Sequence, residues 1–314
     1  DLTRTPGGSS GGCAAALAAD MAPVALGGDG GGSCRRPPAH VGAVGFKPSP
    51  GVIADPWGFP GTLPGIACIG PMGRTVADVR LLFETIAGMH LEDPLSVPPA
   101  PASGRDIRTL RLAYSPQLGL GLPLDDDVRT AVDAGIATLR RAGLDVQEAD
   151  PTWPPATAEA RILAIEDAGL ADLFGAEWRQ DPGRFDPAIG VQIERGLGRS
   201  AAEVAAAHAF SLRIAATIAC FLANWDLLLC PTTACVAWAA NRLDPPTVGG
   251  RTAAHRDHAA FTPLFNHARV PAISIPCGTG NGGMPVGLQI IGRRLSDRDV
   301  LAAATWMERQ LAPS

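Results

Sequence analysis

Two serine sites framed by glycines stand near the start of this sequence. Ser9 and Ser10 lie inside the run GGSSGG at positions 7–12, and Ser33 directly follows three glycines at 30–32. Glycines let a backbone turn sharply and leave main-chain N–H groups pointing into a concavity, where they can hold a developing negative charge. A hydroxyl beside such donors is suited to attack on a carbonyl carbon. Ser33 is therefore a candidate nucleophile, and Ser9 could relay its proton.

Three interpretations of these glycine clusters compete. A phosphate-cradling loop of the type GxxxxGK[ST] requires a lysine after the last glycine, and neither cluster has one. A glycine-rich turn between a helix and a strand is the simplest interpretation of a lone cluster. The presence of two clusters, each with a serine, favours the third interpretation, which is a nucleophilic serine with main-chain oxyanion donors.

The stretch from Pro6 to Pro48 resembles the signature region of the amidase signature family of serine hydrolases. That family carries GGSSGGS, a small-residue helix, the pattern G-[ST]-D-x-GGSIR-x-PA and a following G-x-KP. This chain matches the pattern at 7–12, Asp29, Gly31, Gly32, Ser33, Arg35, Pro37 and 45–48. The resemblance implies that Ser33 is the acyl-accepting nucleophile, and that Ser9, held by a cis peptide bond, bridges it to a lysine base. It also implies hydrolysis of a carbon–nitrogen amide bond through an acyl-enzyme.

The residues around Ser33 are expected to support this chemistry. Main-chain N–H groups would hold the oxyanion, and the candidates for this oxyanion hole are Gly30, Gly31 and Gly32. Asp29 and Arg35 flank the nucleophile with opposite charges, and we expect them to form a pair that rigidifies the loop. Direct substrate contact is their less favoured role. Ser10 is expected to donate hydrogen bonds locally.

Three positions depart from the family pattern. Cys34 replaces the usual isoleucine, and Pro38 replaces alanine. Arg36 brings a charge where an apolar residue is common, so it could reshape the mouth of the site. The loop that follows the signature has three residues that could line a substrate entrance or, equally, anchor the loop: Trp57, Phe59 and Pro60.

The family's general base has no counterpart in this sequence. The base lysine of the family lies many tens of residues before GGSSGG, whereas only eight residues precede Ser9 here. Lys47 is the only lysine, and it matches G-x-KP rather than the base. No histidine has a carboxylate partner evident at short range, so a Ser-His-Asp arrangement has no support. We therefore expect residues 1–314 to be one amidase signature domain, truncated at its N-terminus and catalytically silent as it stands.

The composition favours a compact enzyme acting on a small amide, and it argues against several partner classes. Hydrophobic residues make up 46% of the sequence and charged residues 18%, which supports a large core. The net charge is −5 and no basic run occurs, so nucleic acid is not expected as a partner. The seven cysteines have no CxxC spacing and the histidines are scattered, so neither a metal nor a cofactor is expected. The longest apolar stretch, Ile214–Trp225, is too short to span a bilayer, so no membrane partner is expected. We expect a cytoplasmic location, with a homodimer as an option.

Local signals locate the elements that must position the serines. The small-residue run Cys13–Ala19 suits a tightly packed helix. Capping boxes open two helices, one at Thr75 and Asp78, the other at Ser200 and Glu203. A βαβ unit, which implies a parallel strand pair, is expected from a strand at 110–114, a helix opened by Asp125 or Asp126 and a strand at 144–149. Further expected elements are strands at 227–230 and 286–291 and a closing helix at 296–311. With the resemblance, this pattern predicts an α/β fold of α/β/α layers around a mixed, largely parallel central sheet.

Two rival functions remain open. The A subunit of a tRNA-dependent glutamine amidotransferase has the same signature, but it usually carries a tyrosine-rich middle segment with an arginine for the amino-acid carboxylate. This chain has a single tyrosine, Tyr114, so this function ranks second. The other rival is a non-catalytic remnant that still binds ligands or partners, which the missing lysine favours.

Overall fold

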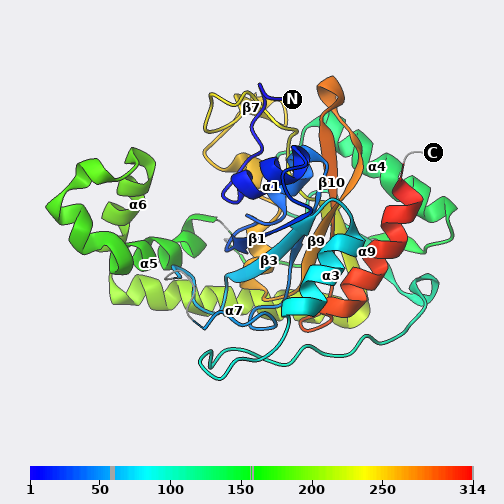
Figure 1. Ribbon diagram of the computed structural model, residues 1–314, viewed down its shortest axis with the longest axis horizontal. Helices are drawn as coiled ribbons and strands as arrows, with labels where there is room; N and C mark the ends of the chain where they lie inside the picture. Colours follow the sequence, from blue (N-terminus) through cyan, green and yellow to red (C-terminus); the bar gives the residue numbers. More distant parts are fainter. Residues whose placement is uncertain (57–60, 156, 158, 313–314) are drawn as a thin grey trace.

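An eight-stranded sheet runs through the centre of the molecule (Figure 1). The computed structural model describes residues 1–56, 61–155, 157 and 159–312. The strand order is β1-β3-β2-β9-β10-β6-β4-β5. The strands are β1 Val24–Asp29, β2 Val44–Lys47, β3 Cys68–Gly73, β4 Leu112–Tyr114, β5 Val146–Glu148, β6 Leu227–Pro231, β9 Ala272–Thr279 and β10 Pro285–Ile291. A separate two-stranded ribbon consists of β7 Thr247–Val248 and β8 Arg251–Thr252.

Helices cover both faces of the sheet, so the predicted α/β class and its α/β/α layers are confirmed. One face carries α3 (Val76–Ile86), α4 (Asp126–Arg141) and α9 (Asp297–Leu311), which also contact one another. The opposite face carries α1 (Gly11–Ala18), the predicted small-residue helix, and α2 (Arg36–Val41). The sheet is therefore buried between two helical layers, and the loops at its edges are left to form a site.

The mixed sheet is confirmed, but parallel pairing has a smaller share in it than we expected. β4 pairs in parallel with β5 and with β6, whereas the other five pairings among the described strands are antiparallel. The β4–β5 pair is the predicted βαβ unit, with α4 as its crossover helix. β9 and β10 are instead joined by a short turn at 280–284, and so short a connection can only return the chain in the antiparallel direction.

The predicted helix starts are largely confirmed. At α3 the Thr75 side chain accepts from the Asp78 N–H while the Asp78 carboxylate accepts from the Thr75 N–H. Ser200 and Glu203 form the same reciprocal pair at the start of α7 (Ala201–Asn224). α4 does begin after Asp125, but the Asp125 carboxylate accepts from the Gly249 N–H at 2.7 Å instead of capping the helix.

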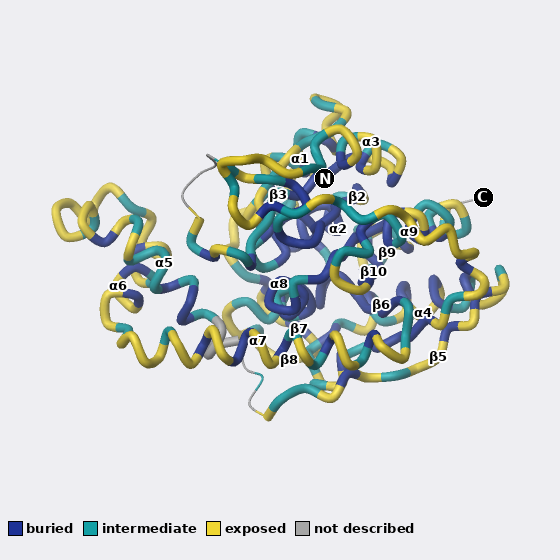
Figure 2. Tube along the Cα trace, turned by 90° about the horizontal axis from the view of Figure 1, so that it is seen from below, coloured by how far each residue is buried: buried dark blue, intermediate teal, exposed yellow. Residues whose placement is uncertain are grey.

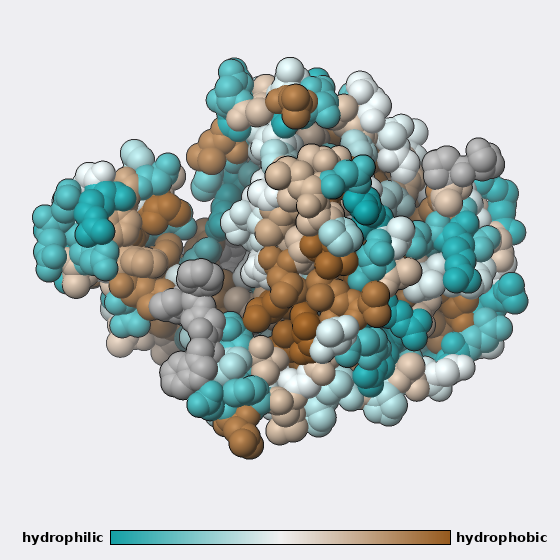
Figure 3. Space-filling model, viewed as in Figure 1, coloured by the Kyte–Doolittle hydropathy of each residue, from teal (hydrophilic) through white to brown (hydrophobic). Residues whose placement is uncertain are grey.

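Burial falls off sharply from the sheet to a helical arm (Figure 2). β2 and β6 are buried at every position, as expected for strands covered on both faces. The arm, formed by α5 (Glu159–Gln180) and α6 (Pro187–Leu197), extends from the body and is mostly exposed or half-buried. In the space-filling view the most apolar surface gathers over β3 and α3, where Leu81 is exposed (Figure 3).

α7 is the helix on which the arm rests, because it contacts α5 on one side and α8 (Pro263–His267) on the other. Among the described residues it is the one helix that is long and apolar enough, by length and composition, to cross a membrane. One side of it is buried, through Ala207, Phe210, Ser211, Ile214, Ile218 and Leu222. That spacing of three and four residues is the pattern of a helix laid on a globular core.

Candidate active site

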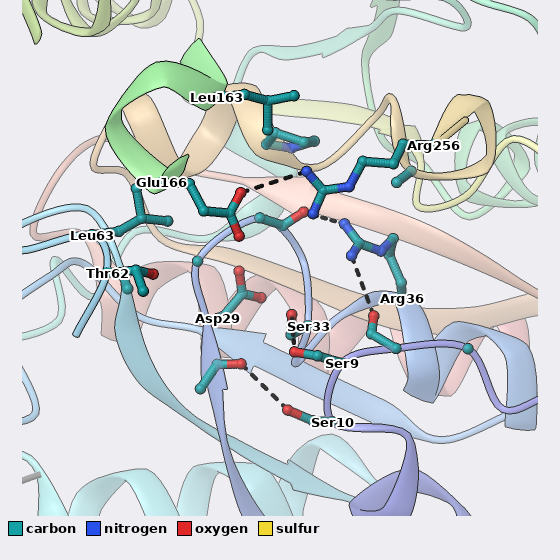
Figure 4. A pocket seen from close by; sticks show the side chains of 18 of the residues that line it. Ser9, Ser10, Asp29, Ser33, Arg36, Thr62, Leu63, Leu163, Glu166 and Arg256 are labelled. Atoms are coloured by element: carbon teal, nitrogen blue, oxygen red, sulfur yellow. Dashed lines mark hydrogen bonds and ion pairs between the residues drawn. The ribbon is translucent and has the colours of Figure 1, made fainter. Parts of the chain in front are cut away.

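The two predicted serines meet directly. Ser9 Oγ donates a hydrogen bond to Ser33 Oγ at 2.8 Å, although the residues are 24 positions apart (Figure 4). Ser33 lies between β1 and α2, and Ser9 lies just before α1. The Gly8–Ser9 peptide bond is cis, as the resemblance implied. Packing of α1 beside β1 and α2 thus brings a potential nucleophile and a potential proton relay into contact.

Asp29 organises the main chain around Ser33. Its carboxylate is fully buried and accepts from the N–H groups on both sides of Ser33, that of Gly32 at 2.7 Å and that of Cys34 at 3.1 Å. Arg35 donates to both carboxylate oxygens at 2.9 Å, which is the expected pair. Burial by itself raises the pKa of Asp29, but the charge and hydrogen bonds of Arg35 outweigh burial and hold it well below its usual range. Asp29 is therefore an anion whose role is to hold the loop.

The Gly31–Gly32 peptide is held at both ends. Its carbonyl accepts from Thr262 Oγ1 at 2.7 Å, while its N–H is the one that donates to Asp29. The Gly32 N–H is therefore committed within the protein, which argues against Gly32 as an oxyanion donor. The N–H groups of Gly30 and Gly31 have no acceptor in the described part of the chain. They are the two glycine donors left to face a substrate.

Several positions in this shell come from the far end of the sequence. Arg35 donates to the Thr262 carbonyl at 3.1 Å, to Gln289 Oε1 at 2.7 Å and to Asn266 Oδ1 at 2.6 Å. Asn266 also donates to Asp29. Thr262 and Asn266 lie in the segment 261–266, and the sequence offers no sign that this segment lies against the serine loop. Gln289 carries no signal of its own, because it is a single polar residue in an otherwise apolar, buried strand.

The serines open onto a large cavity of about 2370 Å³. Ser9, Ser33 and Arg36 lie on one side of it, and Glu166 of α5 and Arg256 lie across from them (Figure 4). Glu166 and Arg256 form an ion pair with 3.5 Å between Oε2 and Nη1. Ser10 also lines the cavity and donates to the Gly28 carbonyl at 3.3 Å, a local contact as expected. The proposed entrance residues Trp57, Phe59 and Pro60 lie outside the described residues.

The family model of the amidases matches residues 1–301. This chain belongs to the amidase family. The match covers nearly the whole chain, so the family assignment rests on the full sheet and its helices and not on the signature region alone.

Named relatives of this amidase family member include two functional types. An acylamidase of Rhodococcus erythropolis is 35% identical over 317 residues, which cover 98% of this chain and 65% of that protein. The A subunit of the glutamyl-tRNA(Gln) amidotransferase of Symbiobacterium thermophilum is 33% identical over 97% of this chain and 66% of that protein. The solved structure of a bacterial aryl acylamidase of the amidase signature enzymes has a TM-score of 0.87 at 25% identity, over 99% of this chain and 66% of that one. The chain thus spans 65% to 66% of the length of these relatives.

Lys47, the only lysine of this chain, does not contact the serine pair. Its ammonium donates to the Pro48 carbonyl at 3.0 Å, and among the described residues neither Ser9 nor Ser33 is its partner. Burial is the main cause that lowers the pKa of Lys47, with the charge of Arg35 adding to it. Its position supports the interpretation that Lys47 belongs to the structural G-x-KP motif.

The sequence showed no carboxylate partner for a histidine at short range, but the fold brings one carboxylate to two histidines. Asp244 lies 3.0 Å from His255 Nδ1 and 3.3 Å from His258 Nδ1, and both histidines line the cavity. The sequence spacing of 11 residues between Asp244 and His255 hides this contact, which depends on how the segment around β7 and β8 folds back. Burial lowers the pKa of His258 to about 4. No hydrogen bond joins either histidine to a serine in the described chain, so no Ser-His-Asp triad is formed.

Proposed function

We propose that this protein hydrolyses the amide bond of a small molecule, with Ser33 as nucleophile and Ser9 as proton relay. The observation that carries the proposal is the 2.8 Å hydrogen bond between the two hydroxyls at the edge of a glycine-lined cavity. The acylamidase and aryl acylamidase relatives support the same reaction class. The substrate is a small amide whose acyl part is held in the cavity.

The reaction would proceed by acyl transfer. Ser33 Oγ forms a bond to the carbonyl carbon while its proton passes to Ser9 and on to a base. The oxyanion is held by the N–H groups of Gly30 and Gly31, and loss of one such donor costs about 3–4 kcal/mol of transition-state stabilisation in other hydrolases. The carbon–nitrogen bond then breaks as the amine leaves with the returned proton. Water attacks the resulting ester in the same way and releases the carboxylic acid.

The final proton acceptor is proposed to be a lysine from outside residues 1–314. A serine hydroxyl is a weak nucleophile without a base within hydrogen-bond reach. Lys47 is engaged elsewhere, and the cavity histidines are not bonded to either serine in the described chain. The greater length of the relatives leaves room for such a segment.

The nucleophile is tested by labelling with a fluorophosphonate probe. In the full-length protein Ser33→Ala should abolish labelling, because the probe bonds to the activated oxygen. Ser103→Ala, an exposed serine outside the cavity, is the matched control and should label like the parent. Labelling that persists in Ser33→Ala would remove Ser33 from the mechanism.

The missing base predicts that the chain from Asp1 to Ser314 is catalytically silent. Without the base only residual catalysis from the oxyanion donors and from substrate binding should remain. The measurement is turnover of a panel of aliphatic and aromatic amides by this chain and by the full-length protein. Comparable turnover by both, lost on Ser33→Ala, would show that a residue within 1–314 acts as base.

The second candidate is the A subunit of a glutamine amidotransferase. The relatives with that name favour it, at 33% and 34% identity in two of them. The single tyrosine of this chain argues against it. Glutamine hydrolysis that appears only together with a co-purifying partner protein would support this candidate over a free-standing amidase.

A further inference from the structure

Arg36 joins the two segments that carry the serine pair. It is the first residue of α2, and its side chain is buried while lining the cavity. One arm of its guanidinium, Nη2, donates to the Gly8 carbonyl at 3.2 Å (Figure 4). The other arm, Nη1, donates to the Gly31 carbonyl and to Thr262 Oγ1, the latter at 3.0 Å.

Each of these two carbonyls is close to a serine along the chain. The Gly8 carbonyl belongs to the peptide bond that enters Ser9, and the Gly31 carbonyl lies two residues before Ser33. The guanidinium is planar and presents its donors in a fixed fork, so it can bridge two acceptors with little loss of freedom. A lysine ammonium is a single point of charge and lacks this fork. Arg36 therefore connects the two serine segments, in addition to the Ser9–Ser33 hydrogen bond itself.

Two other roles are open to a buried arginine in a cavity. It could bind an anionic group of the substrate, or it could contribute only to folding by anchoring α2. The hydrogen bonds named above favour neither, because both arms reach main-chain carbonyls beside the serines. Charged donors also make the stronger and shorter hydrogen bonds, which suits a group that must fix a distance.

We propose that Arg36 is a positioning residue, which holds Ser9 Oγ and Ser33 Oγ at hydrogen-bond distance so that a proton can pass between them. This inference rests on the proposed function of the serine pair. Its chemical consequence is specific. Loss of the bridge should slow formation of the acyl-enzyme while leaving the walls that bind the substrate in place.

The test compares Arg36→Met and Arg36→Lys with Arg108→Met in the full-length protein. Arg108 is exposed and lies outside the cavity, so its variant controls for the loss of one positive charge. We expect Arg36→Met to lower kcat and the fluorophosphonate labelling rate of Ser33 by about 10–100-fold, the order of loss that a misplacement near 1 Å brings. KM should change little. Arg36→Lys should recover part of the rate, because it retains the charge but can reach only one of the two carbonyls well.

Three results would overturn the inference. Unchanged kcat and labelling rate in Arg36→Met would show that the bridge is not needed, and a raised KM with unchanged kcat would assign Arg36 to substrate binding. A lower melting temperature with normal rate per folded molecule would leave Arg36 a structural role only. If Arg36→Met does not fold, Arg36→Lys decides the matter in the same assays, since it keeps the charge but not the fork that bridges the two carbonyls.

A crystal structure gives a readout that does not depend on activity. In Arg36→Met the separation of Ser9 Oγ and Ser33 Oγ should exceed about 3.5 Å, the limit of a hydrogen bond. A retained distance of 2.8 Å would contradict the inference. Failure of the proposed function is distinguishable from failure of this inference. If the proposed function fails, Ser33→Ala will still be labelled by the fluorophosphonate, whatever the Arg36 variants show.

Discussion

The buried carboxylate of Asp29 fixes the main chain of the serine loop on both sides of Ser33. It accepts hydrogen bonds from the main chain before and after Ser33 and from Arg35 and Asn266. Its pKa is held low, so its contribution to stability is present above about pH 4 and is lost as the pH falls toward its folded-state pKa. Removal of its charge leaves Arg35 buried without a counter-ion.

Asp29→Asn should therefore destabilise the fold strongly. The expected loss in free energy of unfolding is about 3–5 kcal/mol, the usual result of breaking one side of a buried ion pair. The measurement is urea unfolding at pH 7. Asp20→Asn is the matched control, because Asp20 pairs with Arg74 at an exposed site, and it should lose at most about 1 kcal/mol. Equal losses in the two variants would show that burial of the Asp29–Arg35 pair does not matter.

At the scale of elements, the arm of α5 and α6 is joined to the cavity through neighbouring acidic residues. Glu166 pairs with Arg256 at the cavity wall, while the next residue, Asp167, is buried and accepts from Arg195 and Arg199. Arg195 lies in the last turn of α6, and Arg199 lies just before α7. One carboxylate thus ties the end of α6 and the start of α7 to α5. Because Asp167 is the next residue on α5, these two ion pairs also help to fix the position of Glu166.

Asp167→Asn should loosen the arm without unfolding the sheet. We expect faster amide hydrogen exchange over 181–199, because the link from α5 to α6 and α7 weakens when the carboxylate charge is lost. Strands β9 and β10 should exchange as in the parent protein. Asp172→Asn, an exposed position on the same helix, is the control. Unchanged exchange over 181–199 would mean that apolar contacts alone hold the arm.

For the whole molecule, buried neutral histidines make the fold sensitive to acid. His40 and His267 are both buried, and burial is the main cause that lowers the pKa of each to about 3. Neither ring nitrogen of His40 has a hydrogen-bond partner in the described chain. The unfolded chain binds protons at these groups below about pH 6.5, whereas the folded chain does not. The contribution of these two neutral histidines to the free energy of unfolding is therefore full above pH 6.5, and it is lost as the pH falls from there toward 3.

Between pH 7 and pH 5 these two histidines should together lower the free energy of unfolding by about 4 kcal/mol, at roughly 1.4 kcal/mol per pH unit for each below pH 6.5. Urea unfolding at pH 7, 6 and 5 measures the slope. His40→Leu should reduce that slope by about 1.4 kcal/mol per pH unit below pH 6.5, because a leucine leaves no titrating group and no unpaired nitrogen. His90→Gln replaces an exposed histidine and should leave the slope unchanged. A parent slope near zero would contradict the prediction.

The local and motif-level features of this protein were determined by the sequence alone. The capping boxes of α3 and α7 depend on residues three positions apart, so neighbours in the chain suffice to predict them. The α/β class follows from the strand and helix pattern together with the family resemblance. Ser33, Ser9 and the Asp29–Arg35 pair were named from the signature, because their residue types and spacing match the family pattern.

The tertiary structure decided what long-range packing controls. Antiparallel pairing dominates the sheet, but the sequence did not show it, because the order and direction of strands that pair at long range do not follow from local periodicity. The sequence could not show that Gln289 and Asn266 complete the shell of Arg35, since they are more than 200 positions away and no period links them. It could not show the Asp244 contacts with His255 and His258. Nor could it show that the Gly32 N–H donates to Asp29 or that Arg36 bridges both serine segments. Both contacts depend on the position of the side-chain terminus in the folded structure.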